Sequence, residues 1–117
     1  MVRMNKITKN NLVDENLECC EDWELWLKLI SSGAHVTILN RCLSFIRIHD
    51  TNISRNTLKM RVGALKVLQN AEKYLPAKIK NKAGLKTKIT FAMLTLAWHK
   101  ILSQFKTEGR ALLKEII

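Results

Sequence analysis

The excess positive charge of this chain lies entirely in its second half. Residues 1–56 contain seven Lys or Arg and seven Asp or Glu, so their formal charges cancel. Residues 57–117 contain thirteen basic and three acidic residues, which accounts for the net charge of +10. A chain of 117 residues has room for one small core. The charge distribution therefore indicates two regions of different character, 1–56 and 57–117.

The composition excludes several classes of protein. Apolar residues make up 47% of the chain and charged residues 26%, which is typical of a globular protein and argues against disorder. No apolar stretch reaches the roughly 18 residues of a membrane-spanning helix, and the first residues lack the apolar core of a signal peptide. The three cysteines have neither a disulfide framework nor metal-site spacing. We expect a cytoplasmic protein.

An amphipathic helix is predicted over about residues 21–32. Its apolar side chains recur at i, i+3, i+4 and i+7, which places them on one face. These residues are Trp23, Trp26, Leu27 and Ile30, and the two tryptophans are expected to be core residues. Gly33 follows as a left-handed stop.

Short strands are predicted on both sides of this helix. Residues 1–7 alternate loosely between apolar and polar, which indicates a short strand. Residues 35–39 and 43–48 are rich in apolar and β-branched side chains, and Asn40 and Arg41 separate them as a turn. The first region is therefore predicted to contain a strand pair.

The second region is predicted to be helical. A helical pattern over 58–72 ends before Pro76, because proline lacks a backbone donor and restricts the residue before it. The apolar run 89–98 and an amphipathic stretch over 99–106 follow. We expect an interruption at Glu108–Gly109–Arg110 and a last helix over 111–117.

Five lysines precede the apolar run and leave two interpretations open. They are Lys78, Lys80, Lys82, Lys86 and Lys88. In the first, residues 78–98 dock on an anionic membrane surface, with the lysines near the headgroups and the apolar face buried. In the second, residues 89–98 pack against the helix at 58–75 and the lysines form a solvated face.

Four residues of the first region are candidates for chemistry. Glu21 and Asp22 begin the predicted helix, where the macrodipole and free backbone donors keep a carboxylate ionised and able to accept a proton. Acids at this position are also ordinary helix-start chemistry. His49 suits a metal or phosphate but equally a structural role, and Arg47 suits a phosphate, a carboxylate or a local ion pair.

The order of these segments resembles the C-terminal half of the catalytic domain of family 2 glycosyltransferases. The family has a phenylalanine–Asp–Glu segment, a helix that begins Glu-Asp-aromatic-Asp-Leu-Trp-Leu-Arg, and a strand that ends in tyrosine–arginine–x–histidine. Here the matching segments are 13–17, 21–29 and 43–49, with Gly33 between the last two. The phenylalanine, second acid, arginine and tyrosine are replaced by Val13, Glu24, Lys28 and Phe45.

The resemblance implies a fold and a role for each residue. It implies an α/β, mainly helical chain: residues 1–56 as the C-terminal, acceptor-side portion of a GT-A domain with a short strand pair, and 57–117 as a basic helical extension. Asp22 matches the general base of an inverting transfer, and Glu21 and Trp23 match the acceptor site. His49, supported by Arg47, matches a contact to the metal and diphosphate of the donor.

One part of the family pattern is missing. The family binds a nucleotide-diphosphate sugar through Mg²⁺ or Mn²⁺ held by an Asp-x-Asp motif, and this chain has no such motif. The resemblance therefore implies a fragment without the nucleotide-binding half, inactive and without cofactor by itself. In the full enzyme the partners are the donor and a sugar or lipid-linked acceptor, and polysaccharide biosynthesis is the common setting. The enzyme would be peripheral on the inner membrane face if residues 78–98 dock there.

The alternative function is a small basic helical module that binds nucleic acid or an acidic surface. Lys and Arg contacts to phosphates supply most non-specific affinity for nucleic acid. However, aromatic residues are not interleaved with these lysines, and no zinc-finger or RNP signature is present. Nucleic acid is therefore not the expected partner.

Overall fold

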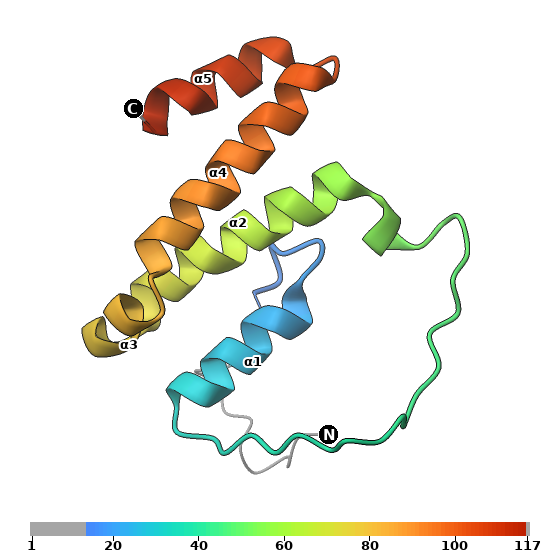
Figure 1. The fold of residues 1–117 in the computed structure, drawn as a ribbon, viewed down its shortest axis with the longest axis vertical. Coiled ribbons are helices and arrows are strands. Elements are labelled where there is room, and N and C mark those ends of the chain that lie inside the picture. The colour runs from blue at the N-terminus through green and yellow to red at the C-terminus, as the bar shows by residue number, and fades with distance from the viewer. Residues whose placement is uncertain (1–13, 117) are drawn as a thin grey trace.

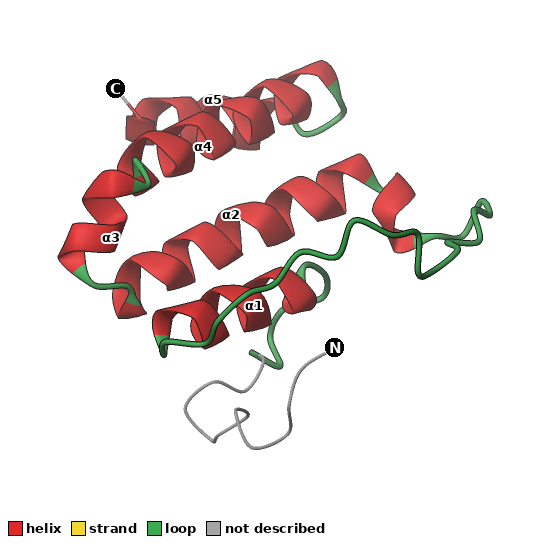
Figure 2. Cartoon of the chain, turned by 60° about the horizontal axis from the view of Figure 1, so that its bottom comes forward, coloured by secondary structure: helices red, strands yellow, loops and turns green. Residues whose placement is uncertain are grey.

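The computed structural model describes residues 14–116, which form five α-helices and one 3₁₀ turn (Figure 1). In chain order these are α1 (Glu21–Ser31), η3 (Ile53–Arg55), α2 (Thr57–Tyr74), α3 (Ala77–Lys82), α4 (Leu85–Leu102) and α5 (Lys106–Ile116). The two longest helices, α2 and α4, pack against each other. Helix α1 packs on α2, and α5 folds back along α4 (Figures 1 and 2).

Helix α1 has the predicted bounds but not the predicted buried face. Gly33 adopts a φ of 85°, and its N–H donates to the carbonyl of Ile30 at 3.0 Å, which confirms the left-handed stop. The buried residues of α1 are Glu24 and Leu29. Trp23, Trp26 and Ile30 are exposed, so the expectation of a tryptophan core is wrong. The Glu24 carboxylate accepts a hydrogen bond from Asn70 of α2, so this side of α1, rather than the tryptophan side, faces α2.

The small core lies between the end of α2 and the start of α4. Leu68, Ala71 and Leu75 contact Leu85, and partly buried apolar side chains of α1 and α4 pack around them. The predicted break before Pro76 is confirmed, because α2 ends at Tyr74 and Leu75 is extended. These contacts fix the angle at which α4 crosses α2.

The apolar residues of 89–98 pack against the rest of the protein on one side of α4 only. Ile89 and Ala92 pack against the core, as the second interpretation predicted, and Ala97 is buried toward α5. Phe91 and Trp98, on another face of the same helix, are exposed. Among residues 14–116, no helix is long and apolar enough to cross a membrane.

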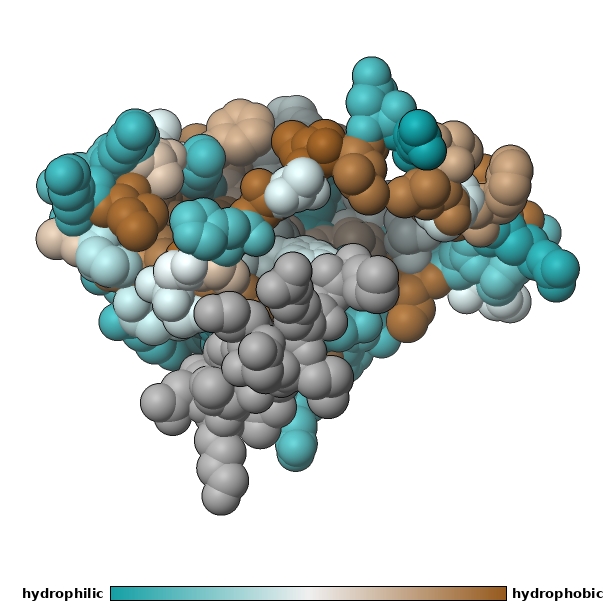
Figure 3. Space-filling model, turned by 90° about the horizontal axis from the view of Figure 1, so that it is seen from below, coloured by the Kyte–Doolittle hydropathy of each residue, from teal (hydrophilic) through white to brown (hydrophobic). Residues whose placement is uncertain are grey.

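The predicted α/β fold class with a strand pair is wrong for the described residues, which contain no strand. Residues 35–39 and 43–48 are extended and exposed. On the face of the molecule seen from below, hydrophobic side chains lie at the surface beside hydrophilic ones (Figure 3). A hairpin turn needs positive φ angles, which neither Asn40 nor Arg41 adopts. An isolated pair of strands is also marginal in water. The strand predicted at 1–7 lies outside the described residues.

The predicted interruption at Glu108–Gly109–Arg110 is also wrong, because these residues lie inside α5. Glycine is needed there for close packing rather than for a break. A Cβ atom on Gly109 would lie 2.7 Å from the carbonyl oxygen of Ala97 and 2.9 Å from the amide nitrogen of Ile101. The backbones of α4 and α5 therefore meet at this residue.

This contact predicts that Gly109→Ala destabilises the protein. In an uncrowded helix the change stabilises by about 1 kcal/mol through helix propensity. Here the added methyl group meets backbone atoms, and we expect the free energy of unfolding to fall by about 1–3 kcal/mol, measured by urea denaturation. The control is Thr107→Ala at an exposed position of α5. A Gly109→Ala protein as stable as the wild type would contradict the close approach.

Candidate functional site

The first residues of α1 are held in place by two cysteines that contact α2. The thiol of Cys19 lies 3.3 Å from the carbonyl oxygen of Lys59, and that of Cys20 lies 3.9 Å from the carbonyl oxygen of Met60. Gly63 makes this approach possible, because a Cβ atom there would lie 2.4 Å from the Cys19 sulfur. Burial, followed by the neighbouring Cys19, raises the pKa of Cys20 to about 11, so this thiol stays protonated and donates. The cysteines are structural.

Cys20 also sets the direction in which α1 leaves this contact. Its φ is 63°, in the left-handed region, which costs a non-glycine residue energy. An ion pair between Glu18 and Lys59, at 2.9 Å, ties the preceding residues to α2. The hydrogen bond from Lys59 lowers the pKa of Glu18. The start of α1 is therefore anchored to α2.

Glu21 and Asp22 project into solvent from this anchored end. Both are exposed, and an Asp22 carboxylate oxygen accepts the backbone N–H of Trp23 at 2.7 Å. Neither carboxylate has an ion-pair partner among residues 14–116. Asp22 is thus an exposed carboxylate at an anchored helix start.

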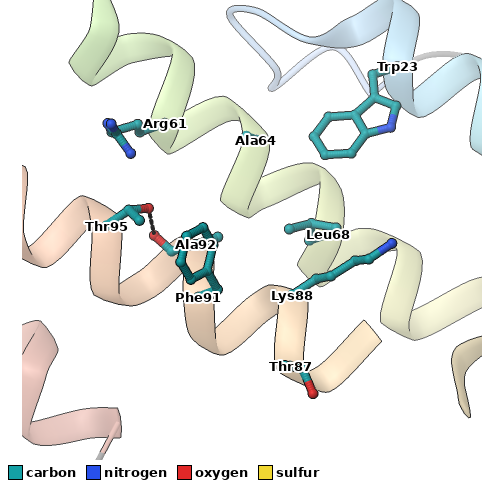
Figure 4. Close-up of a pocket in the computed structure, with 9 residues that line it drawn as sticks. All are labelled: Trp23, Arg61, Ala64, Leu68, Thr87, Lys88, Phe91, Ala92 and Thr95. Carbon is teal, nitrogen blue, oxygen red and sulfur yellow. Dashed lines mark hydrogen bonds between the residues drawn. The ribbon is translucent and has the colours of Figure 1, made fainter. Parts of the chain in front are cut away.

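Trp23, the next residue, forms one wall of an apolar groove between α2 and α4. The groove has a volume of about 480 Å³. Its lining residues are Trp23, Arg61, Ala64, Leu68, Thr87, Lys88, Phe91, Ala92 and Thr95. In Figure 4 the Trp23 indole reaches from α1 over Leu68, and Phe91 lies across the same space on α4. Asp22 is therefore the chain neighbour of a residue that faces an apolar groove.

Glu24 has an entirely different role from the two acids before it. It is 1% exposed and receives three donors. Its Oε2 accepts the backbone N–H of Asp14 at 3.0 Å and the Lys28 ammonium at 3.2 Å, and its Oε1 accepts the Asn70 amide at 2.9 Å. Asn70 also donates to Asp14 at 3.1 Å. This network joins α1, α2 and the residues before α1.

Tyr74 lies near this network, and the negative charge of Glu24 acts on its phenol. Burial, followed by the negative charge of Glu24, raises the pKa of Tyr74 to about 12. Its buried hydroxyl has no hydrogen-bond partner among the described residues. The phenol is therefore held in its neutral form by its surroundings.

The structure does not bring His49 and Arg47 to Asp22. Both lie in the segment between α1 and η3, which swings out from the helices (Figures 1 and 2). His49 Nδ1 lies 2.8 Å from the Thr51 hydroxyl, and the Arg47 carbonyl accepts the Asn52 amide at 3.0 Å. Asp50 pairs with Arg55 in the same segment. The predicted donor-side residues are exposed and separate from the predicted base.

Residues 14–116 do not form a divalent-metal site by themselves. Over 14–116, no three His, Cys, Asp or Glu side chains gather closely enough to hold a metal ion. His49, the one predicted ligand, has a hydroxyl as its neighbour rather than a carboxylate. The predicted Mg²⁺ or Mn²⁺ of the full enzyme would need ligands from outside the described residues.

The sequence alone did not reveal two features of this site. The partners of Glu24 come from Asp14 and Asn70, 10 and 46 residues away, and no local spacing links them. The groove depends on where α4 crosses α2, which a helical pattern does not specify. The acid at position 24, between Trp23 and Leu25 in a helix with many apolar residues, was a usable signal, since a charge that is buried there needs partners.

Comparisons of this chain with protein-family models, curated proteins and solved structures find no match.

The Glu24 network predicts that Glu24→Ala is strongly destabilising. The change removes the acceptor of the Asp14 N–H and one of the two acceptors of the Asn70 amide in a partly buried place, which costs about 1–3 kcal/mol of unfolding free energy. Exposed Glu21→Ala, in the same helical turn, is the matched control and should change stability by less than about 0.5 kcal/mol. Equal losses in the two variants would show that the network adds no stability.

The surroundings of Tyr74 predict a loss of stability at high pH. A raised pKa means that the folded protein favours the neutral phenol, so this contribution is complete below pH 10.0 and is lost as pH rises toward about 12. Tyr74 is the one tyrosine of the chain, so tyrosinate absorbance reports it directly. Tyr74→Phe should keep its stability at neutral pH and lack this alkaline loss. A wild-type ionisation midpoint near 10 would contradict the burial.

Proposed function

We propose that this chain is the acceptor side of an inverting glycosyltransferase, with Asp22 as the general base. The observation that carries the proposal is that three acids at the start of one helix lie in different environments. Glu24 is buried in a hydrogen-bond network, whereas Glu21 and Asp22 are exposed at the start of α1, which is anchored to α2. The same segment, 21–29, carries the resemblance to family 2 glycosyltransferases.

In the proposed reaction Asp22 takes the proton from an acceptor hydroxyl. The hydroxyl oxygen forms a bond to the anomeric carbon of the donor sugar while the bond to the nucleotide diphosphate breaks, which inverts that carbon. A base must be ionised and within hydrogen-bond reach of the hydroxyl. Asp22 is exposed at the start of α1, which allows an acceptor hydroxyl to reach it.

Glu21 and Trp23 are the proposed acceptor contacts beside this base. A carboxylate accepts sugar hydroxyls, and an indole offers a flat apolar face together with one N–H donor. The groove beyond Trp23 is lined mostly by apolar side chains, including Leu68 and Phe91. This chemistry suits an acceptor sugar attached to an apolar carrier, such as a lipid-linked saccharide in polysaccharide biosynthesis on the cytoplasmic side of a membrane.

Residues 14–116 are not proposed to bind the nucleotide part of the sugar donor. Arg47 and His49 are exposed and free to meet a diphosphate that another part of the enzyme presents. Nucleotide-sugar binding, with its Mg²⁺ or Mn²⁺, requires an Asp-x-Asp that this chain lacks. The proposal therefore gives this chain proton transfer and acceptor binding, and no step through a metal.

Asp22→Asn tests the base assignment in an enzyme that joins this chain to a donor-binding half. Asparagine keeps the size of the side chain and its hydrogen bond to the backbone of Trp23 but accepts no proton. We expect kcat for sugar transfer to fall about 10²- to 10⁴-fold with little change in stability. The control is Glu15→Gln, an exposed carboxylate outside α1.

Two results would reject the assignment. Wild-type kcat in Asp22→Asn would show that the carboxylate is not the base. A matching fall in Glu15→Gln would show that the loss reflects general charge. Binding of a saccharide acceptor to this chain alone, read by tryptophan fluorescence and weakened by Trp23→Ala but not by Trp26→Ala, would separately support the acceptor side.

A further inference from the structure

A stretch of 35 residues, 73–107, contains eight lysines and no Asp or Glu. It covers α3, α4 and their connections. Two of these lysines have partners in the fold, since Lys73 donates to Asn70 and Lys100 pairs with Glu108. The other six have no ion pair among the described residues. Five of these six lie close together in the sequence: Lys78, Lys80, Lys82, Lys86 and Lys88. The fold therefore leaves a block of positive charge uncompensated.

An unpartnered apolar stripe runs along α4, and Lys88 adjoins it, three residues before Phe91. Phe91, Leu94, Trp98 and Leu102 recur at i, i+3, i+7 and i+11, so they share one face of the helix. They are 67%, 41%, 63% and 69% exposed. Ile79 of α3, between two of the lysines, is 41% exposed. No described element packs over this stripe, whereas Leu85 and Leu96 of the same helix are buried.

We propose that α3 and α4 dock this chain on the surface of an anionic lipid bilayer. Lysines of α3 and the first turns of α4 meet the headgroups, and Phe91, Trp98 and their neighbours enter the boundary with the acyl chains. Helices that lie in a membrane interface combine these features, a cationic cluster and exposed aromatic and aliphatic side chains. Tryptophan in particular favours the membrane–water boundary.

Charge complementarity alone would also suit a nucleic acid, and the apolar stripe decides between the two. Phosphate contacts need lysines but not exposed leucines, and single-stranded nucleic acid needs aromatic side chains along the cationic groove. Here the aromatic residues lie on α4 beyond the lysine cluster and are accompanied by aliphatic neighbours. The inference does not depend on the proposed enzymatic function, because vesicle binding requires no sugar transfer, although Lys88 and Phe91 belong to both the groove and this surface.

The test is co-sedimentation of the full chain with vesicles of phosphatidylcholine, with and without phosphatidylserine or phosphatidylglycerol. We expect binding that requires the anionic lipid and weakens as salt screens the charges. Replacing Lys78, Lys80 and Lys82 by glutamine should weaken binding about 100-fold, at about fivefold per lysine. The charge-matched control replaces Lys66, Arg110 and Lys114, exposed cations of α2 and α5, and should have a smaller effect.

Trp98 reports whether the apolar stripe enters the bilayer. Quenching of tryptophan fluorescence by lipids with brominated acyl chains should be lost in Trp98→Phe and kept in Trp26→Phe, which alters an exposed tryptophan of α1. Phe91→Ser should weaken vesicle binding without unfolding the chain, because Phe91 is exposed.

Three results would overturn the proposal. The first is the absence of vesicle binding at low salt. The second is equal binding to neutral and anionic vesicles. The third is binding to double-stranded DNA that exceeds vesicle binding and is unchanged by Phe91→Ser, which would assign the lysines to nucleic acid instead.

Discussion

The rest of this structure depends on one buried carboxylate. Glu24 receives donors from Asp14, Lys28 and Asn70, and so joins the residues before α1 to α1 itself and to α2. A buried charge without such partners would be unfavourable, so the network must form as a unit. Its geometry turns the Glu24 face of α1 toward α2. As a result Glu21, Asp22 and Trp23 point elsewhere, toward solvent and the groove.

Local pattern predicted α1 and the end of α2, missed α3 and the boundary between α4 and α5, and failed where a distant partner was needed. The bounds of α1 and the end of α2 before Pro76 follow from periodicity, glycine and proline, which act over a few residues. The strands predicted at 35–39 and 43–48 did not form, because a strand needs a neighbour to pair with and sequence shows no neighbour. Gly109 was misjudged for a related reason, since its role is set by α4 across the crossing.

For the candidate site, too, the sequence predicts local features but not the distances between segments. The exposure of Glu21 and Asp22 at a helix start follows from the sequence, whereas their distance from His49 depends on the segment that connects α1 to η3. The radius of gyration, 16.4 Å, exceeds the roughly 13 Å typical of a compact chain of this length. That excess agrees with the segment between α1 and η3, which stands away from the helices, and with α5, which packs on α4 rather than on α2 (Figure 1).

The extended segment between α1 and η3 has a consequence for handling the protein. Over residues 35–48 the backbone makes no hydrogen bond to another described backbone group, and Ile38, Phe45 and Ile46 are at least 85% exposed. Such a stretch is a template for cross-β association between copies of the chain. Arg41 and Arg47 interrupt it with like charges, which act as gatekeepers against stacking in register. Added salt screens these charges, so association through this segment should increase with salt concentration.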